Sequence, residues 1–362
     1  MEHLDIRSAT VRGKLSPARL VGSRLFRRHL ALFFATVLIG LSAVLAINAA
    51  VDPLWYWRGN IVTGENFAFN ERFAKLNQFL RAPESYDCLI FGSSRATLLD
   101  QTQIENYRCA NLAFSAGVVS EFVAVARYLK AQGFSPKLVI VGVDAFNFWR
   151  DMEPTLPDFV KRGQPPPGWI STYLSMSALS FSLRTLVDDS PFPRIYDKNL
   201  IGRVDEDAPT YVPPRLGNMV VKPREFDVSR QEYYIELRAI FPHARYVGYV
   251  PPISAWNTAE DLYLTGHIDE YLVAMKAIAG RFDALYDLSV PSEITMDPDY
   301  TYDGDHYRAA VNAVVADILQ GQSHRFGIEI RGVTLAQYTR IYDDAFKGFL
   351  RSIRLDNLGG DG

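Results

Sequence analysis

The chain has 362 residues, of which 48% are hydrophobic and 22% charged. This balance supplies enough apolar surface for a sizeable core and excludes a globally disordered chain. The formal net charge is -3 at pH 7. The chain therefore lacks the basic excess of a nucleic-acid-binding protein, and we expect no nucleic acid among its partners.

An uncharged segment at residues 30–51 is the first feature along the chain. A helix of about 20 apolar residues is long enough to cross a bilayer. Residues 1–29 form a basic tail with seven Arg or Lys residues against two acidic ones, and the positive-inside rule keeps such a tail in the cytoplasm. Because the apolar run exceeds the h-region of a signal peptide and no Ala-x-Ala site follows, we predict an uncleaved single-pass anchor. A cleaved signal peptide is the alternative.

Strands and helices alternate after a connector at residues 52–85, which itself contains a predicted helix at about residues 71–80. Near-continuous apolar runs predict strands buried on both faces, and apolar residues at helical spacing predict the helices between them. The predicted strands are residues 87–91, 109–112, 137–143, 246–250 and 284–288, and the predicted helices are residues 118–131, 229–240, 267–282, 307–319 and 335–351.

Prolines interrupt this alternation between about residues 150 and 230, where we predict a helical and loop insertion that covers one end of the sheet. The remaining pattern predicts an α/β domain at residues 86–321 and a C-terminal helix and tail at residues 322–362. We expect a flavodoxin-like three-layer α/β/α fold with a mainly parallel five-stranded sheet, in addition to one N-terminal transmembrane helix.

The two cysteines, Cys88 and Cys109, fall on predicted neighbouring strands. In an oxidising compartment they can pair, whereas Cys88 can equally be a small buried hydrophobic residue. The sequence leaves both interpretations open. No CxxC or HxxxH spacing accompanies either cysteine, so we expect no metal site.

A serine follows the first predicted strand, in the segment Gly92-Ser93-Ser94-Arg95. Glycine permits a sharp exit from the strand, and a helix after the serine would direct its N-terminal amides toward an oxyanion. Ser94 is the candidate nucleophile because it lies two residues after the glycine, and Ser93 is its rival. The simpler interpretation is that one of these serines only caps the helix.

An acid and a histidine, Asp303 and His306, stand three residues apart just before a predicted helix. A histidine oriented by a carboxylate is a general base, so Ser94, His306 and Asp303 contain the parts of a Ser-His-Asp nucleophilic site. Asp305 is an alternative acid, and helix capping is the alternative role for the histidine. In a parallel sheet the site lies at the carboxyl ends of the strands, where Ser94 and Asp144 are predicted.

Three ordered blocks resemble those of the SGNH/GDSL hydrolases: Gly92-Ser93-Ser94, the Asn-Leu-Ala-Phe-Ser-Ala-Gly segment at residues 111–117, and Asp303-x-x-His306. With the N-terminal anchor and Asp52-Pro53, the chain is more specifically similar to SGNH-like proteins of bacterial envelope-polysaccharide systems. These include the alginate O-acetylation proteins and the D-alanyl transfer protein of teichoic acid modification. The resemblance covers about residues 85–320 without the insertion.

This resemblance implies that Ser94 is the nucleophile, His306 the base and Asp303 its partner, with the Ser94 and Gly117 amides lining the oxyanion hole. The chain departs from the family at two points. The family's glycine usually follows the serine of the second block directly, but here Ala116 intervenes.

The family's Gly-x-Asn-Asp block is the second departure, because residues 142–147 replace it. Either Asn147 supplies the missing oxyanion donor or none exists. Asn111, Arg95 and Asp144 complete the candidate substrate-binding residues. Arg95 either meets an anionic polymer or lies on a helix surface, and Asp144 either contacts substrate or orients a loop through backbone amides.

The sequence and its resemblance predict a membrane-anchored SGNH-like O-acyl (acetyl) esterase or acyltransferase of the bacterial inner membrane. Its N-terminus would be cytoplasmic and its main domain periplasmic, acting on an envelope or exported polysaccharide. A membrane-embedded acyl donor protein is the implied partner for a transfer reaction. The alternative is a catalytically silent SGNH-fold subunit that binds polysaccharide or scaffolds an envelope assembly. No P-loop or G-x-G-x-x-G motif occurs, and we expect no cofactor.

Overall fold

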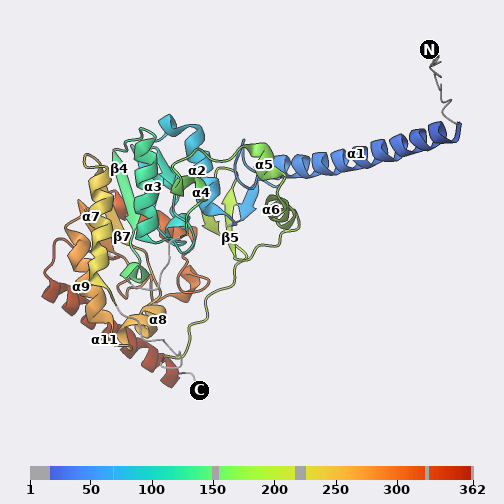
Figure 1. Cartoon of the computed structure of the whole chain (residues 1–362). Helices are drawn as coiled ribbons and strands as arrows, with labels where there is room; N and C mark the ends of the chain where they lie inside the picture. Colours follow the sequence, from blue (N-terminus) through green and yellow to red (C-terminus); the bar gives the residue numbers. More distant parts are fainter. Residues whose placement is uncertain (1–16, 68, 149–154, 217–225, 323–325, 360–362) are drawn as a thin grey trace, which may run out of the picture.

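The computed structural model describes residues 17–67, 69–148, 155–216, 226–322 and 326–359. The first part of the predicted basic tail, residues 1–16, lies outside the described residues. Helix α1 (Pro17–Val51) projects away from the remainder of the chain, which folds around a central sheet (Figure 1).

The central sheet has six strands in the order β3-β2-β4-β7-β8-β9. The first five are mutually parallel, and β9 joins the edge antiparallel to β8. All five predicted strands form, but the predicted strand number is wrong by one because the two-residue β9 is too short to show an apolar pattern. The strands are β2 Cys88–Phe91, β3 Cys109–Asn111, β4 Leu138–Gly142, β7 Arg245–Val250, β8 Ala284–Asp287 and β9 Ile328–Glu329.

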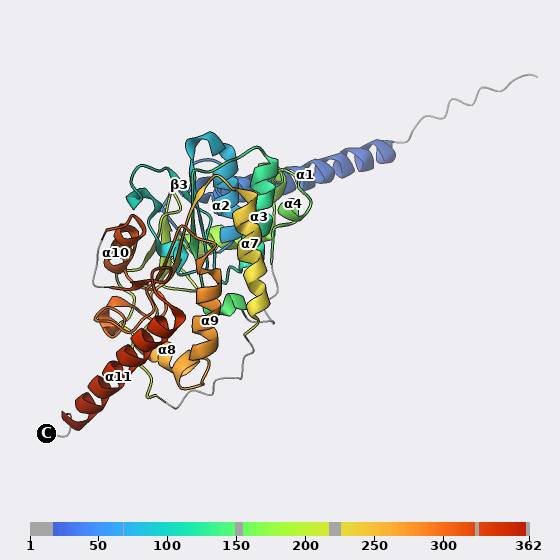
Figure 2. The ribbon, with the colours of Figure 1, turned by 90° about the vertical axis from the view of Figure 1, so that its left-hand side faces the viewer.

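Helices cover both faces of this sheet. Successive strand residues point to opposite faces, so Leu89 and Phe91 of β2 pack in one core with α2, α3, α7, α9 and α11, while Cys88 and Ile90 pack in another with α10. Figure 2 shows α10 on the opposite side of the sheet from α3 and α7. Because neither face meets water, the strands are apolar at nearly every position. The helices are α2 Glu71–Arg81, α3 Val119–Ala131, α7 Gln231–Ile240, α9 Ile268–Ala279, α10 Ala309–Leu319 and α11 Leu335–Gly359.

Helix α1 is the one helix of the described residues that is long and apolar enough to cross a membrane, over Arg24–Val51. Its side chains are exposed throughout residues 24–43. The 28-residue stretch as a whole has the length of a membrane span, and its uncovered apolar side chains fit one. A signal sequence at the N-terminus would have the same form.

Buried polar side chains attach the end of α1 to the domain. Asp52 follows the helix in a left-handed conformation (φ 46°), and its carboxylate accepts the backbone N–H groups of residues 56–59 and the Tyr173 hydroxyl. Asn48 donates to the Tyr173 carbonyl at 2.8 Å and accepts from the Ser182 hydroxyl at 2.7 Å. Breaking a buried bond leaves an unsatisfied polar group, so these contacts hold α1 firmly against α5 (Trp169–Tyr173) and α6 (Met176–Leu186).

The insertion contains more regular structure than its prolines predict. Its strands join β1 of the connector in a second, three-stranded sheet of order β1-β5-β6, and strands this short leave no periodic pattern in a sequence. Its helices α5 and α6 pack against the end of α1 (Figure 1), a contact that the predicted insertion over one end of the central sheet did not include. The elements are β1 Glu65–Phe67, α4 Asp158–Lys161, α5 Trp169–Tyr173, α6 Met176–Leu186, β5 Arg194–Asp197 and β6 Gly202–Val204.

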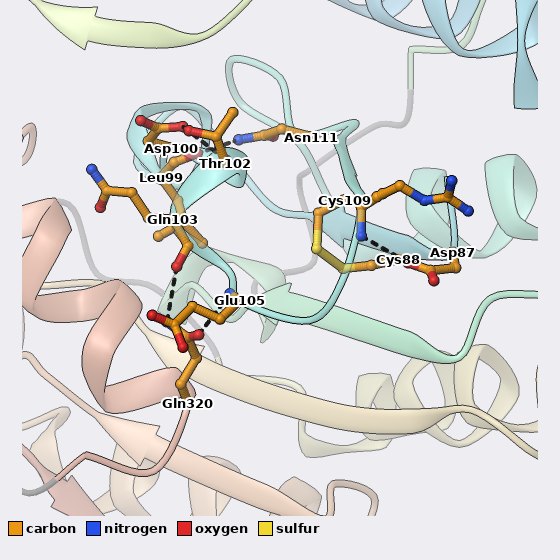
Figure 3. The surroundings of a disulfide bond; sticks show 11 residues. Asp87, Cys88, Leu99, Asp100, Thr102, Gln103, Glu105, Cys109, Asn111 and Gln320 are labelled. Atoms are coloured by element: carbon orange, nitrogen blue, oxygen red, sulfur yellow. Dashed lines mark hydrogen bonds between the residues drawn. A yellow bond between two sulfur atoms is a disulfide. The ribbon is translucent and has the colours of Figure 1, made fainter. Parts of the chain in front are cut away.

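A disulfide joins Cys88 and Cys109, which are directly paired residues of the neighbouring strands β2 and β3 (Figure 3). The structure thereby decides between the two interpretations that the sequence left open. The bridge spans a sequence separation of 21 residues, and the enclosed segment carries Ser94. The cross-link therefore ties together the two ends of the segment that contains the candidate nucleophile.

Replacing both cysteines by alanine should lower the free energy of unfolding by about 3 kcal/mol, because closing a loop of this length removes that much chain entropy from the unfolded state. Thermal unfolding of the full chain in mild detergent measures the difference. Reduced wild-type protein is the control for lost side-chain packing and should unfold together with the double variant. Equal midpoints for oxidised and reduced wild type would contradict the prediction.

Candidate active site

The serine loop begins where β2 ends. A Cβ on Gly92 would lie 2.4 Å from the Cβ of Ala96 and 3.3 Å from the Cα of Gly142 on the neighbouring strand, so only glycine fits there. Ser93 is buried, whereas Ser94 is half-buried. The helix expected after Ser94 is absent. A single short 3-10 turn (Ala96–Leu98) takes its place, so the expected N-terminal amides of a helix are not available to the site.

The histidine loop is a tight turn closed by an antiparallel bridge between Thr301 and Tyr307. The Thr301 hydroxyl donates to the His306 carbonyl at 2.9 Å and accepts the Gly304 N–H at 3.0 Å. Gly304 has φ 85°, and a Cβ there would lie 2.6 Å from the Asn257 side chain. These contacts fix the backbone on which the acid and the histidine are carried.

The structure brings Ser94, His306 and Asp303 together in one hydrogen-bonded chain. The Ser94 Oγ lies 2.8 Å from His306 Nε2, and His306 Nδ1 lies 2.7 Å from Asp303 Oδ2. The other carboxylate oxygen of Asp303 accepts the N–H groups of Asp305 and His306 at 2.9 and 2.8 Å. A carboxylate at Nδ1 places the ring proton there, which leaves Nε2 to accept the proton of the serine hydroxyl.

The environment of Asp303 favours its ionised form. Burial alone would raise its pKa, but the hydrogen bond and charge of His306, together with the N–H groups of Asp305 and His306, lower the pKa below its ordinary value. The carboxylate is therefore ionised at neutral pH and orients the imidazole. Asp305, the alternative acid, has its own side chain directed to Arg95 at 3.9 Å.

Sequence reasoning missed Tyr302, which stacks on the histidine. The Tyr302 and His306 rings have centroids 5.6 Å apart and an interplanar angle of 15°, and the Tyr302 hydroxyl lies 3.5 Å from His306 Nδ1. Burial and the Asp303 charge raise the pKa of Tyr302 well above its ordinary value, so the hydroxyl stays protonated. Its place next to the DGDH segment was the available signal.

The half-buried Arg95 and the buried Asp144 form an ion pair at 3.3 Å. Burial raises the pKa of Asp144 despite the Arg95 charge and the Ser93 hydroxyl. Burial lowers the pKa of Arg95, but Asp144 and Asp305 outweigh burial and raise it. Arg95 thus connects the serine loop to the end of β4 and to the histidine loop, rather than lying on a helix surface.

Asn111 has a structural task rather than a place facing substrate. Its side-chain amide donates to the Leu99 carbonyl at 2.9 Å (Figure 3). The same amide donates to the Ala96 carbonyl at 2.9 Å, and the side-chain oxygen accepts the Ala113 N–H at 3.0 Å. The residue is buried. It fastens the segment after Ser94 to the end of β3, which corrects the prediction of a substrate contact.

The Gly117 amide is already engaged, because it donates to the Phe114 carbonyl at 3.0 Å. Ala116, directly after Ser115, has φ 52°, a backbone conformation that favours glycine. Ala116 therefore has a glycine-like backbone conformation at the position where the sequence resemblance would place a glycine. Gly117 instead packs against the serine loop, where its Cβ would lie 2.7 Å from the Gly92 carbonyl oxygen.

Three hydrogen-bond donors beside the serine loop have no acceptor among the residues that the structure describes. They are the backbone N–H groups of Ser94 and Ala116 and the buried side-chain Nδ2 of Asn147. The Asn147 oxygen is fixed by the Val119 N–H at 2.7 Å. A substrate oxygen that develops negative charge next to Ser94 could accept hydrogen bonds from these three donors.

The segment around Ser115 is held from two other elements. Glu71 of α2 accepts the Ser115 N–H at 2.6 Å, and Arg194 of β5 donates to the Ser115 hydroxyl at 3.1 Å. Arg194 is buried, and its Nε and Nη1 atoms have no hydrogen-bond partner within the described chain. Sequence reasoning missed Arg194 because it lies in the insertion, far along the chain from every motif.

No group of three or more His, Cys, Asp or Glu side chains is placed to hold a metal ion within the described ranges. No protein-family model matches the chain, and no curated protein matches it. Eight chains of solved structures do match. One of them is a Streptococcus pneumonia protein whose description names a platelet activating factor. It aligns over 70% of this chain and 92% of its own length, with a TM-score of 0.37 and 9% identity. A likeness at this level establishes no activity, so the candidate site stands on its own geometry.

Replacing Asp303 by asparagine should destabilise the protein at neutral pH, and the difference should shrink as the pH falls below about 4. The lowered pKa means that the ionised carboxylate stabilises the folded state above the unfolded pKa, and that this contribution disappears as the pH falls through the folded pKa. Unfolding midpoints of both proteins at neutral pH and at about pH 3 measure the effect. A difference that is independent of pH would contradict the ionised state assigned to Asp303.

Proposed function

We propose that the protein is a serine-dependent O-acyl esterase or acyltransferase of SGNH type, anchored in a membrane by α1. The hydrogen-bonded chain Ser94–His306–Asp303 is the observation that carries the proposal. The five parallel strands lie in the order β3-β2-β4-β7-β8. Only β3 departs from chain order, because it lies outside β2, and this order supports the flavodoxin-like arrangement of that fold. A long distance between the serine and the histidine would favour the catalytically silent alternative, but Ser94 Oγ lies within hydrogen-bond distance of His306 Nε2.

In the proposed reaction, Ser94 Oγ attacks the carbonyl carbon of an acyl ester while His306 Nε2 takes the hydroxyl proton. The N–H groups of Ser94 and Ala116 and the Asn147 Nδ2 receive the developing oxyanion. His306 then returns the proton to the leaving alcohol, and an acyl-enzyme remains on Ser94. Water in a hydrolase, or a sugar hydroxyl in a transferase, loses its proton to His306 and releases the acyl group by the reverse sequence.

We further propose a glycan as the substrate or acceptor. A pocket lies directly beside the ion-paired Arg95 and Asp305, and it combines polar and apolar walls that would suit a sugar ring. Its lining also includes Ala145, Phe146, Ile253, Asn257 and Leu262. The membrane-embedded acyl donor protein, the periplasmic location and the bacterial inner membrane belong to the same proposal, and their support is the sequence resemblance and the form of α1.

Ser94→Ala should abolish covalent labelling by a fluorophosphonate probe, since only an activated serine hydroxyl reacts with it. Ser93→Ala is the matched control and should keep the label, because it removes the neighbouring hydroxyl without touching His306. Fluorescence of the labelled full chain on a denaturing gel is the measurement. Labelling that persists in Ser94→Ala and is lost in Ser93→Ala would move the nucleophile to Ser93.

His306→Ala should slow turnover of a small acetyl ester by about 10²–10⁴-fold, the usual contribution of a positioned general base. The measured quantity is kcat/KM of the full chain at neutral pH, with unfolding midpoints as a check that the variant folds. His243→Ala, which removes an exposed histidine that belongs to neither the pocket nor the proton relay, is the comparison. Equal rates for wild type and His306→Ala would remove the base assignment.

A further inference from the structure

Helix α6 exposes apolar side chains in a part of the insertion that has few charged residues. Residues 163–183 contain no charged side chain. On α6, Met176, Leu183 and the following Val187 are exposed by 75%, 46% and 72%. Soluble domains rarely leave a contiguous apolar surface of this kind uncovered.

The surface of α6 is divided into three sectors. Ala178, Ser182 and Thr185, spaced at four and three residues, are buried and form the inner sector. At 100° per residue, Met176, Leu183 and Val187 fall together on an apolar sector. Ser177 and Arg184 fall on the remaining polar sector. A short helix with one packed, one apolar and one polar sector is typical of a helix lying at a membrane interface.

Helix α6 lies beside the last turns of α1. Ser182 donates to Asn48 of α1 at 2.7 Å, and Leu45 of α1 packs on the cluster that contains Ala178. Figure 1 shows α6 at the root of α1, viewed nearly along its own axis while α1 runs across the view. Helix α6 is therefore crosswise to α1, which places it along the plane of a membrane that α1 spans.

The uncovered length of α1 is too short to cross a bilayer alone. The uncharged run begins at Leu30, and protein begins to cover the helix at Val44. The intervening stretch of about 14 residues has a length of about 21 Å, whereas the hydrocarbon core is about 30 Å thick. The remaining hydrocarbon thickness of about 9 Å would be crossed by the last turns of α1, which α6 covers. Interfacial helices sink about 5–10 Å into the membrane, which is a similar depth.

Aromatic and aliphatic side chains continue this surface around the root of α1. The Trp57 and Trp169 rings lie 5.3 Å apart and are both exposed. The N–H of Ile61 donates to the Ala50 carbonyl at the end of α1, and the Ile61 side chain is 70% exposed. Tryptophan is enriched at the boundary between hydrocarbon and water.

We propose that α6, together with Trp57 and Trp169, inserts into the phospholipid leaflet on the domain side, next to α1. The inference deepens the proposed function, because it rests on α1 spanning the membrane. Lipid is the occupant that the observations favour, since the apolar sector continues the lipid-facing surface of α1. The bonds of Asn48 and Asp52 then fix the catalytic domain in one orientation to the membrane.

Nitroxide spin labels on introduced cysteines test the proposal in the full chain, reconstituted in vesicles of phosphatidylethanolamine and phosphatidylglycerol. Both native cysteines are in the disulfide, so a new cysteine is the only free thiol. Power saturation compares collisions with lipid-soluble oxygen and with a water-soluble nickel chelate. L183C and V187C should show a several-fold higher oxygen-to-nickel ratio than S177C, which lies on the polar sector of the same helix.

V37C in the middle of α1 and I235C on α7 are the references for lipid and water. A lipid-like V37C with a water-like L183C overturns the insertion of α6 and leaves the anchor intact. A water-like V37C overturns the anchor itself. An L183C label that neither reagent reaches, or that becomes shielded only in native membranes, overturns the lipid assignment in favour of a protein partner. Fluorophosphonate labelling of the same samples reports the serine site independently, and unfolding midpoints show that each variant is folded.

Discussion

Burial of the central sheet on both faces is the constraint on which the rest of the structure depends. Polar side chains have no room along strands that pack against helices on either side, so they collect where the strands end. Ser94 follows β2 and Asp144 follows β4, its direct neighbour in the sheet. Two glycines, Gly92 and Gly142, allow these strand ends to approach closely. The candidate catalytic residues are thereby confined to the carboxyl ends of the strands.

The site combines one local interaction with one long-range interaction. Asp303 and His306 are three residues apart, and the bridged loop that carries them fixes their mutual geometry. The contact between Ser94 and His306 joins residues separated by 212 positions. Arg95 supports that long-range contact, because it lies next to Ser94 and its guanidinium faces both Asp144 and Asp305. Moving Arg95 away would leave the buried Asp144 carboxylate unpaired, which is costly, so the ion pair resists displacement of the serine loop.

Much of the fold could be predicted because its signals are local. Continuous apolar runs marked the five parallel strands, and the spacing of Asp303 and His306 marked the acid and base. Other features carry no local signal. Strand β9, the second sheet and the task of Asn111 depend on pairings between distant segments. The disulfide required the register that sets Cys88 directly opposite Cys109. The short turn after Ser94 replaced the expected helix because Asn111 holds the Ala96 and Leu99 carbonyls in place.

The insertion contacts both α1 and the serine site. Its residues Tyr173 and Ser182 form hydrogen bonds to the end of α1, and its Arg194 donates to Ser115 in the loop beside Ser94. A segment that only filled space at the edge of the sheet would have no need of buried polar bonds at both places, because apolar packing stabilises such contacts at lower cost. Hydrogen bonds require particular partners at particular distances, so they fix the positions of α1 and of the loop beside Ser94 relative to the insertion. The orientation of α1 and the arrangement of the serine site are therefore parts of one connected structure.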